Sequence, residues 1–199
     1  MTFSKTSIPK EEVKIDLHCA STGIEKELSS TFSKSQITVR SDAKWKLLVD
    51  TPTSWVWSKL SDVDTDNVIV ATSNPCPEYL LDLRDRGASV IPFIFPIAVM
   101  TQEIRSLIRG NSLIIPHDTS LSKAERQTLF LSAIGLSRKR AAKERGVSPE
   151  TIKSTLRPVF LKLNLTSHND LVNYYFGLWH NIIDWEPPRH VKKNYTHKG

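Results

Sequence analysis

The sequence lacks the residues needed for a disulfide framework or a metal site. Its 199 residues include two cysteines, Cys19 and Cys76, which lie far apart and beside no histidine cluster of metal-ligand spacing. We expect both cysteines to be buried free thiols. None of His18, His117 and His168 has a partner at catalytic spacing, and no glycine loop of the phosphate-cradling kind is present. We therefore expect no metal, no cofactor and no enzymatic activity.

Long apolar runs are also absent. The longest, residues 90–100, is interrupted by Pro92 and Pro96 and is too short to span a bilayer. No apolar segment follows a charged start at the N-terminus, so the sequence indicates no secretory signal. We expect a cytoplasmic protein without a membrane partner.

The positive charge is concentrated in the C-terminal part of the chain. Residues 1–120 contain 13 Lys and Arg against 15 Asp and Glu, whereas residues 121–199 contain 14 against 6. This division favours two domains. A basic domain beside a near-neutral one is typical of nucleic-acid binding, in which lysine and arginine neutralise phosphates and release counterions. Salt should weaken such binding.

Two helices with close packing are predicted after residue 122. Over residues 123–134 apolar side chains recur at helical spacing, and Gly135 follows as a left-handed stop. Ser137 can then cap a second helix, whose apolar face is made of small alanines, Ala141 and Ala142. Gly146 permits a sharp turn into the next helix.

A third helix is predicted to begin with Ser148 as N-cap and Pro149 at the first helical position. Its apolar stripe consists of Ile152, Leu156, Val159 and Leu163. On the opposite face Lys153 and Arg157 lie four residues apart, beside Ser154. Recognition helices meet base edges and phosphates through such polar residues in their first turns. A charged face that meets only solvent is the alternative.

These motifs resemble the LuxR/GerE-type DNA-binding domain of bacterial transcription regulators, over residues 121–172. The shared motifs, in order, are Leu121-Ser122, Glu125-Arg126, Gly135-Leu136-Ser137, Ser148-Pro149-Glu150-Thr151-Ile152-Lys153, Lys162-Leu163 and Leu171-Val172. The resemblance implies a four-helix domain with the helix from Ser148 in the major groove of DNA. The helix from about Ser167 would pack behind it or form a dimer face.

Carried over by position, the resemblance assigns two groups of DNA-binding residues. The groove-reading residues would be Lys153, Ser154 and Arg157. The candidates for phosphate contacts are Thr151, Arg138, Lys139 and Lys162. Phosphate contacts position a protein on DNA without reading its sequence.

Three features depart from the family pattern. Arg140 and Ala141 replace the usual acidic and large aliphatic residues, which makes the first helix of the motif more basic. Thr155 stands where the family often has histidine, and nothing in the sequence explains it. Pro158 removes a backbone hydrogen bond to Ser154 at a cost of about 3 kcal/mol, so we expect the third helix to kink or stop there.

The N-terminal part predicts an α/β domain. The predicted strands are residues 13–19, 36–40, 46–49, 67–71 and 89–93, and the predicted helices are 24–32, 77–85 and 101–108. This alternation favours a parallel sheet with flanking helices. Residues 68–116 resemble the second half of a response-regulator receiver domain, and the first sixty residues resemble it loosely. The second helix of a receiver is missing from the pattern.

The resemblance implies a degenerate receiver. A working receiver needs an acidic pair for Mg²⁺, an aspartate that accepts phosphate, a Thr or Ser, and a lysine. The acidic-pair positions hold His18 and Cys19, and no lysine follows Gly87-Ala88 at the family's position. Asp50 ends the third predicted strand but lies closer to Thr72 than the family spacing requires. We expect Asp50 to be structural rather than a working phosphoacceptor, at most a vestigial one.

Aromatic side chains gather around the third and fifth predicted strands. They are Trp45, Trp55, Trp57, Phe93 and Phe95. They suit a dimer face or a small-ligand pocket, and ordinary core packing is the alternative. The apolar segment 90–100 favours cover by a second chain.

The sequence therefore predicts four segments: a receiver-like domain over 1–115, a linker over 116–122, a DNA-binding domain with an extended last helix over 123–185, and a basic tail over 186–199. We expect a sequence-specific, dimeric transcription regulator of bacterial LuxR type that acts on double-stranded DNA without phosphorylation. One alternative is an auxiliary regulator that acts only as a heterodimer with a partner transcription factor. Another is an antagonist whose helix-turn-helix binds protein.

Overall fold

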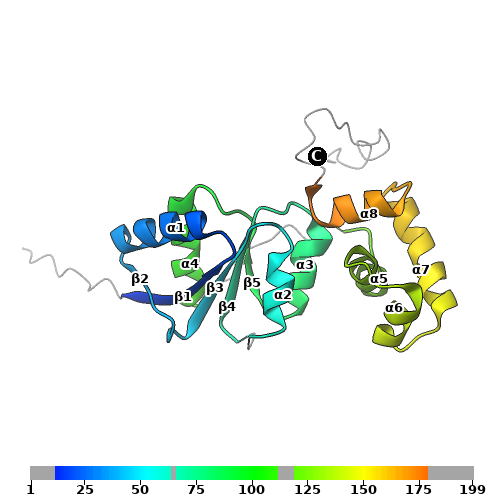
Figure 1. Cartoon of the computed structure of the whole chain (residues 1–199), viewed down its shortest axis with the longest axis horizontal. Helices are drawn as coiled ribbons and strands as arrows, with labels where there is room; N and C mark the ends of the chain where they lie inside the picture. The colour runs from blue at the N-terminus through cyan, green and yellow to red at the C-terminus, as the bar shows by residue number, and fades with distance from the viewer. Residues whose placement is uncertain (1–11, 64–65, 112–118, 179–199) are drawn as a thin grey trace, which may run out of the picture. The chain divides into compact units, whose positions relative to one another are not determined.

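The computed structural model describes residues 12–63, 66–111 and 119–178, which divide into two compact units (Figure 1). The first unit contains the described residues up to Ser73 and those from Gly87 to 111. The second contains Asn74–Arg86 and the described residues from 119 onward. In the part of the chain that the structure describes, no helix is long and apolar enough to cross a membrane.

The first unit is built on a five-stranded parallel sheet with strand order β2-β1-β3-β4-β5. The strands are β1 (Val13–Cys19), β2 (Ile37–Val39), β3 (Trp45–Asp50), β4 (Val68–Thr72) and β5 (Ser89–Ile91). Leu47 of β3 lies opposite Leu17 of β1 and Ile69 of β4, so the inner strands align their apolar residues. The predicted parallel α/β fold is confirmed.

Three helices belong to this unit. They are α1 (Thr22–Lys34), α2 (Trp55–Leu60) and α4 (Ile97–Ile108). Phe32 of α1 and Met100 and Ile104 of α4 are fully buried in one apolar cluster with Ile15 and Leu47 of the sheet. The shared cluster places α1 and α4 on the same face of the sheet (Figure 1).

The connection between β2 and β3 contains no helix, as the sequence predicts. Five residues join Val39 to Trp45, and within them Arg40 donates two hydrogen bonds of 2.9 Å to the Asp42 carboxylate. Three elements of this unit differ from the prediction. Helix α2 is not among the predicted helices. Strand β5 ends at Ile91, because Pro92 cannot donate to the strand ladder. Helix α4 begins at Ile97, earlier than predicted, with Pro96 as its N-cap.

The second unit is helical. Its helices are α3 (Pro77–Asp85), α5 (Lys123–Ala133), α6 (Arg138–Arg145), α7 (Pro149–Lys162) and α8 (His168–Tyr175). The four helices from α5 onward each begin at a serine whose side chain accepts a hydrogen bond from a backbone N–H of the first turn. Gly135 and Gly146 follow α5 and α6 with φ of 81° and 63°, a left-handed conformation that favours glycine.

The predicted extension of the last helix is wrong at its start. Helix α8 ends at Tyr175, and Gly177 follows with φ of 67°. A left-handed residue at this place ends a helix. The rest of the predicted extension, residues 179–185, and the predicted basic tail, 186–199, lie outside the described residues.

Candidate nucleic-acid interface

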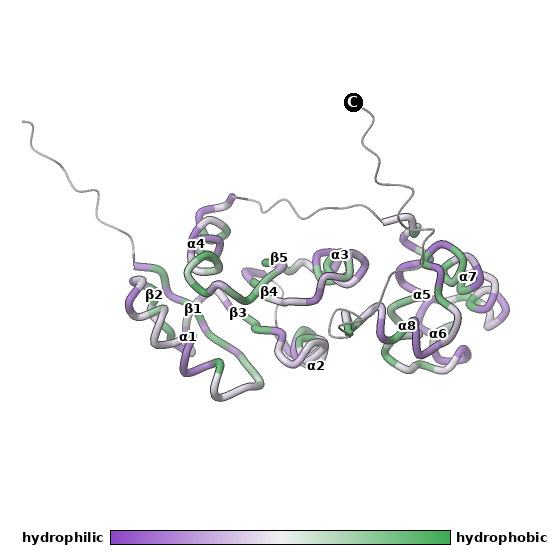
Figure 2. Tube along the Cα trace, turned by 90° about the horizontal axis from the view of Figure 1, so that it is seen from above, coloured by the Kyte–Doolittle hydropathy of each residue, from purple (hydrophilic) through white to green (hydrophobic). Residues whose placement is uncertain are grey.

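Helix α7 has a fixed rotation about its axis because one of its faces is buried. Ile152 and Val159 are fully buried, and Ile152 packs against Ala141 and Ala142 of α6. Leu156 joins this cluster partly buried. The small alanine side chains let the two helices approach closely, so the predicted apolar faces of α6 and α7 meet. Hydrophobic and hydrophilic residues accordingly alternate along α7 (Figure 2).

The opposite side of α7 carries the three predicted groove-reading residues. Lys153, Ser154 and Arg157 are all exposed. We call these three residues the reading face. The Ser154 hydroxyl donates a 3.0 Å hydrogen bond to the Thr151 carbonyl oxygen of its own helix. Two cationic donors therefore stand beside a hydroxyl oxygen that is left as an acceptor.

The candidates for phosphate contacts lie in three different settings. Arg138 and Lys139 are exposed in the first turn of α6. Thr151 is exposed, and its backbone N–H and hydroxyl both contact the Ser148 hydroxyl, at 3.1 and 2.9 Å. Lys162 instead donates a 2.7 Å hydrogen bond to Glu125, which also closes the capping box of α5. This bond holds the pKa of Glu125 below its usual value.

Helix α7 continues past Pro158, so the expectation that it stops there is wrong. The helix runs unbroken to Lys162, with the proline inside it. Val159, the next residue, is fully buried. Burying a valine side chain gains about 1.5–3 kcal/mol, which offsets most of the cost of about 3 kcal/mol for an internal proline.

Helix α3 is predicted from the sequence as a helix of the receiver-like domain, but it belongs to this second unit. Arg126 of α5 is buried and donates to Asp82 of α3 at 3.0 Å and to Asp85 at 2.9 Å. Asp82 also accepts a 2.8 Å hydrogen bond from the Tyr175 hydroxyl of α8. One arginine thus ties two carboxylates of α3 to α5, the first of the four C-terminal helices.

A second buried carboxylate on α3 is held by neutral donors. Glu78 accepts hydrogen bonds from the hydroxyls of Thr119 and of Tyr174, the latter at 2.7 Å. Nearby, the Asn74 amide donates at 2.9 Å to the Tyr175 carbonyl oxygen. The Tyr79 and Tyr175 rings lie 5.4 Å apart. Every acid of this cluster has a donor, which buried polar groups need.

The sequence contains a weak signal for this cluster. Glu78, Asp82 and Asp85 recur at helical spacing, so they share one face of α3. Nothing local identifies their partners, since Arg126 and Tyr174 follow many residues later.

Asp50 lies in a different environment, at the end of β3 in the first unit. Its side chain is buried, and its two oxygens accept hydrogen bonds from the Val56 backbone N–H at 3.1 Å and from the Thr72 hydroxyl at 2.9 Å. Thr72 is its register partner at the end of β4. Of the residues at the acidic-pair positions, His18 contacts Asp16 at 2.9 Å.

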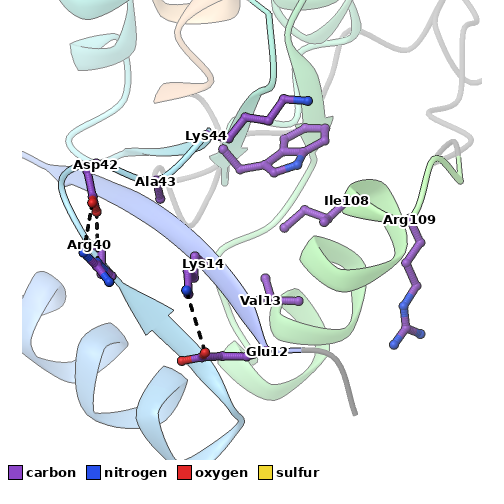
Figure 3. Close-up of a pocket in the computed structure, with 10 residues that line it drawn as sticks. Glu12, Val13, Lys14, Arg40, Asp42, Ala43, Lys44, Ile108 and Arg109 are labelled. Carbon is purple, nitrogen blue, oxygen red and sulfur yellow. Dashed lines mark hydrogen bonds and ion pairs between the residues drawn. The ribbon is translucent and has the colours of Figure 1, made fainter. Parts of the chain in front are cut away.

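A cavity of about 500 Å³ lies at the other end of the sheet, where β1 and β3 begin and α4 ends (Figure 3). Its lining includes Val13 and Ile108 and a rim of charged residues, among them Lys14 and Arg40. Of the aromatic residues expected to form a ligand pocket, Trp45 lines it. A role for this cavity stays a prediction.

The pKa of Asp82 gives the second unit a pH dependence. Burial raises this pKa from 3.8 to about 6, although the Tyr175 hydroxyl and the Arg126 charge lower it. Between these two values the folded protein binds the proton more tightly than the unfolded chain does. We therefore expect stability to fall as pH rises from about 4 to about 6 and to level off above. The unfolding temperature, measured at several pH values between about 4 and 7, tests this dependence.

In the Asp82→Asn variant this contribution is absent, so the unfolding temperature should vary less over the same pH range. A variant with the same pH dependence as the natural chain would show that Asp82 does not titrate there.

Comparison with known proteins agrees with the helical fold of the second unit and the parallel sheet of the first. Residues 119–175 match the family model described as bacterial regulatory proteins, luxR family. A DNA complex of the two-component response regulator RcsB has 16% sequence identity and a TM-score of 0.51, covering 84% of this chain and 100% of that one. RcsB from Salmonella enterica serovar Typhimurium, bound to promoter P1flhDC, has 15% identity and a TM-score of 0.52, with the same coverage.

At these identities the two RcsB structures show a shared fold alone. Among curated proteins, none matches the sequence. The family match covers the four helices from α5 to α8, including α7 with the reading face. Residues 119–175 are therefore a LuxR-type helix-turn-helix domain, in a chain whose first unit has the fold of a response-regulator receiver.

Proposed function

We propose that this chain is a sequence-specific transcription regulator that binds double-stranded DNA with the reading face of α7 in the major groove. The observation that carries the proposal is the exposure of Lys153, Ser154 and Arg157 on the side of α7 opposite the buried Ile152 and Val159. The RcsB structures of the same fold are complexes with DNA, which supports it.

Phosphate contacts would set the position of α7 on the duplex. Arg138 and Lys139 are the better candidates, since both are exposed at the start of α6. Lys162 is already paired with Glu125, so its attraction to phosphate is reduced. Thr151 can offer a hydroxyl from the first turn of α7. These contacts supply affinity and salt dependence, and the reading face supplies specificity.

We further propose that the regulator acts in the bacterial cytoplasm as a dimer. In the first unit, Phe95 precedes α4 and Val99 lies in its first turn, and they expose 52% and 41% of their surface. Exposed apolar residues of this kind suit a contact with a second chain. Nothing in the site calls for enzymatic chemistry, and the described residues contain no group of three or more side chains that could hold a metal ion.

Selection of bound sequences from random duplex DNA at low and high salt tests this function. For a dimer we expect enrichment of a two-fold symmetric site, with half-sites about one helical turn apart. The enrichment should weaken at high salt, because phosphate contacts release counterions. Failure to enrich any sequence at low salt would contradict an autonomous regulator.

Such a failure would favour the alternative of a regulator that binds DNA only as a heterodimer. Two observations support that alternative. Leu161, on the same side of α7 as Arg157, exposes 74% of its surface, an unusual apolar residue for a DNA-facing helix. Pro158 lies within the same helix. A partner protein that covers Leu161 would restore selection when it is added.

Substitution of the cationic reading residues should weaken binding to the selected site. Lys153→Ala and Arg157→Ala are each expected to cost about 1–3 kcal/mol of binding free energy if they contact base edges. Fluorescence anisotropy with a labelled duplex measures this loss. Lys26→Ala, which removes an exposed lysine from α1, is the matched control and should bind normally. Unchanged affinity in both reading-face variants would show that α7 does not bind in the major groove.

We propose that DNA binding does not depend on phosphorylation of Asp50. The carboxylate is buried and already accepts hydrogen bonds from Val56 and Thr72. Addition of beryllofluoride and Mg²⁺ should therefore leave the affinity for DNA unchanged in a binding titration. An increase in affinity that Asp50→Asn abolishes would show a working phosphoacceptor.

A further inference from the structure

One acidic residue stands beside the reading face. Glu150 is exposed in the first turn of α7, three residues before Lys153, four before Ser154 and seven before Arg157. These spacings place the four side chains on one side of the helix. Within the described part of the chain, the Glu150 carboxylate makes no ion pair, so it is available to a ligand.

The exposed hydroxyl of this side is oriented by the helix itself. Ser154 donates to the Thr151 carbonyl oxygen at 3.0 Å. A hydroxyl has one proton, so the Ser154 oxygen is left as an acceptor. Glu150 and Ser154 are therefore acceptors, whereas Lys153 and Arg157 are donors.

We propose that Glu150 determines specificity by accepting a hydrogen bond from the N4 amino group of a cytosine in the major groove. The proposal rests on the proposed DNA-binding function. An ionised carboxylate can only accept, and the donors of the major groove are the amino groups of cytosine and adenine. The adenine amino group adjoins N7, an acceptor that repels a carboxylate. Cytosine is therefore the matching base.

The negative charge of Glu150 also weakens binding to DNA sites that lack this cytosine. A carboxylate among DNA phosphates is repelled wherever the protein binds, and at a cytosine the hydrogen bond offsets that repulsion. Lys153 and Arg157 match guanine, whose groove edge presents two acceptors. The arrangement therefore predicts a half-site in which a contacted cytosine accompanies contacted guanine.

A simpler role for Glu150 is stabilisation of the first turn of α7. An acidic side chain at a helix N-terminus interacts favourably with the helix dipole. That role would give Glu150 an effect on folding and none on the choice of base. The two roles are separated by base preference.

Selection from random duplex DNA by the full chain and by Glu150→Gln and Glu150→Ala variants tests the proposal. A glutamine side chain pairs with adenine through both its donor and its acceptor. We expect Glu150→Gln to change the preference at one position of each half-site from cytosine toward adenine. Glu150→Ala should reduce the preference for cytosine there by roughly tenfold, the order of one base contact. Both variants should bind non-specific DNA more tightly than the natural chain.

Glu144→Gln is the matched control, because it removes an equal charge from an exposed residue of α6. It should leave the selected sequence unchanged. If all four proteins select the same bases with the same preference, Glu150 does not read DNA. The same is true if Glu144→Gln alters the preference as Glu150→Gln does. If the natural chain selects no sequence, the proposed function itself fails, which is apparent before any variant is compared.

Discussion

The packing of Ile152 against Ala141 and Ala142 is the contact on which the proposed DNA-binding surface depends. It fixes the distance between α6 and α7 and the rotation of α7, and Val159 holds the same face inward two turns later. Because that face is buried, Lys153 and its neighbours point to solvent. Replacing a buried isoleucine by alanine costs about 2–5 kcal/mol in general. A looser contact here would also let the reading face turn away from a DNA groove.

The polar cluster around Arg126 adds a different kind of constraint. A buried ion pair contributes little net stability, but a buried charge left without its partner is strongly destabilising. Arg126 therefore favours the packing of α5 against a helix that offers carboxylates, as α3 does with Asp82 and Asp85. Since α3 lies between β4 and β5 in sequence, the helical unit takes one of its helices from within the sheet-forming part of the chain.

The features predicted correctly from the sequence are those with local causes. The serine caps of α6 and α7 and the glycine stops of α5 and α6 act within a few residues, and the apolar stripe of α7 follows from helical spacing. The errors have non-local causes. Burial of Val159 carries α7 past Pro158, where the sequence alone indicates a stop. The place of α3 could not be predicted either, because its partners Arg126 and Tyr175 follow it by many residues.

We propose that DNA contacts the exposed side of α7 and the start of α6. Mapping of backbone amide chemical shifts on titration with a short duplex at low salt tests this placement of the DNA. We predict the largest changes in the first turns of α7, around Lys153 and Arg157, and at Arg138 and Lys139, with little change in β1 to β5. Changes confined to other surfaces, such as the start of α4 or the cavity lined by Lys14, would show that DNA does not bind at α7.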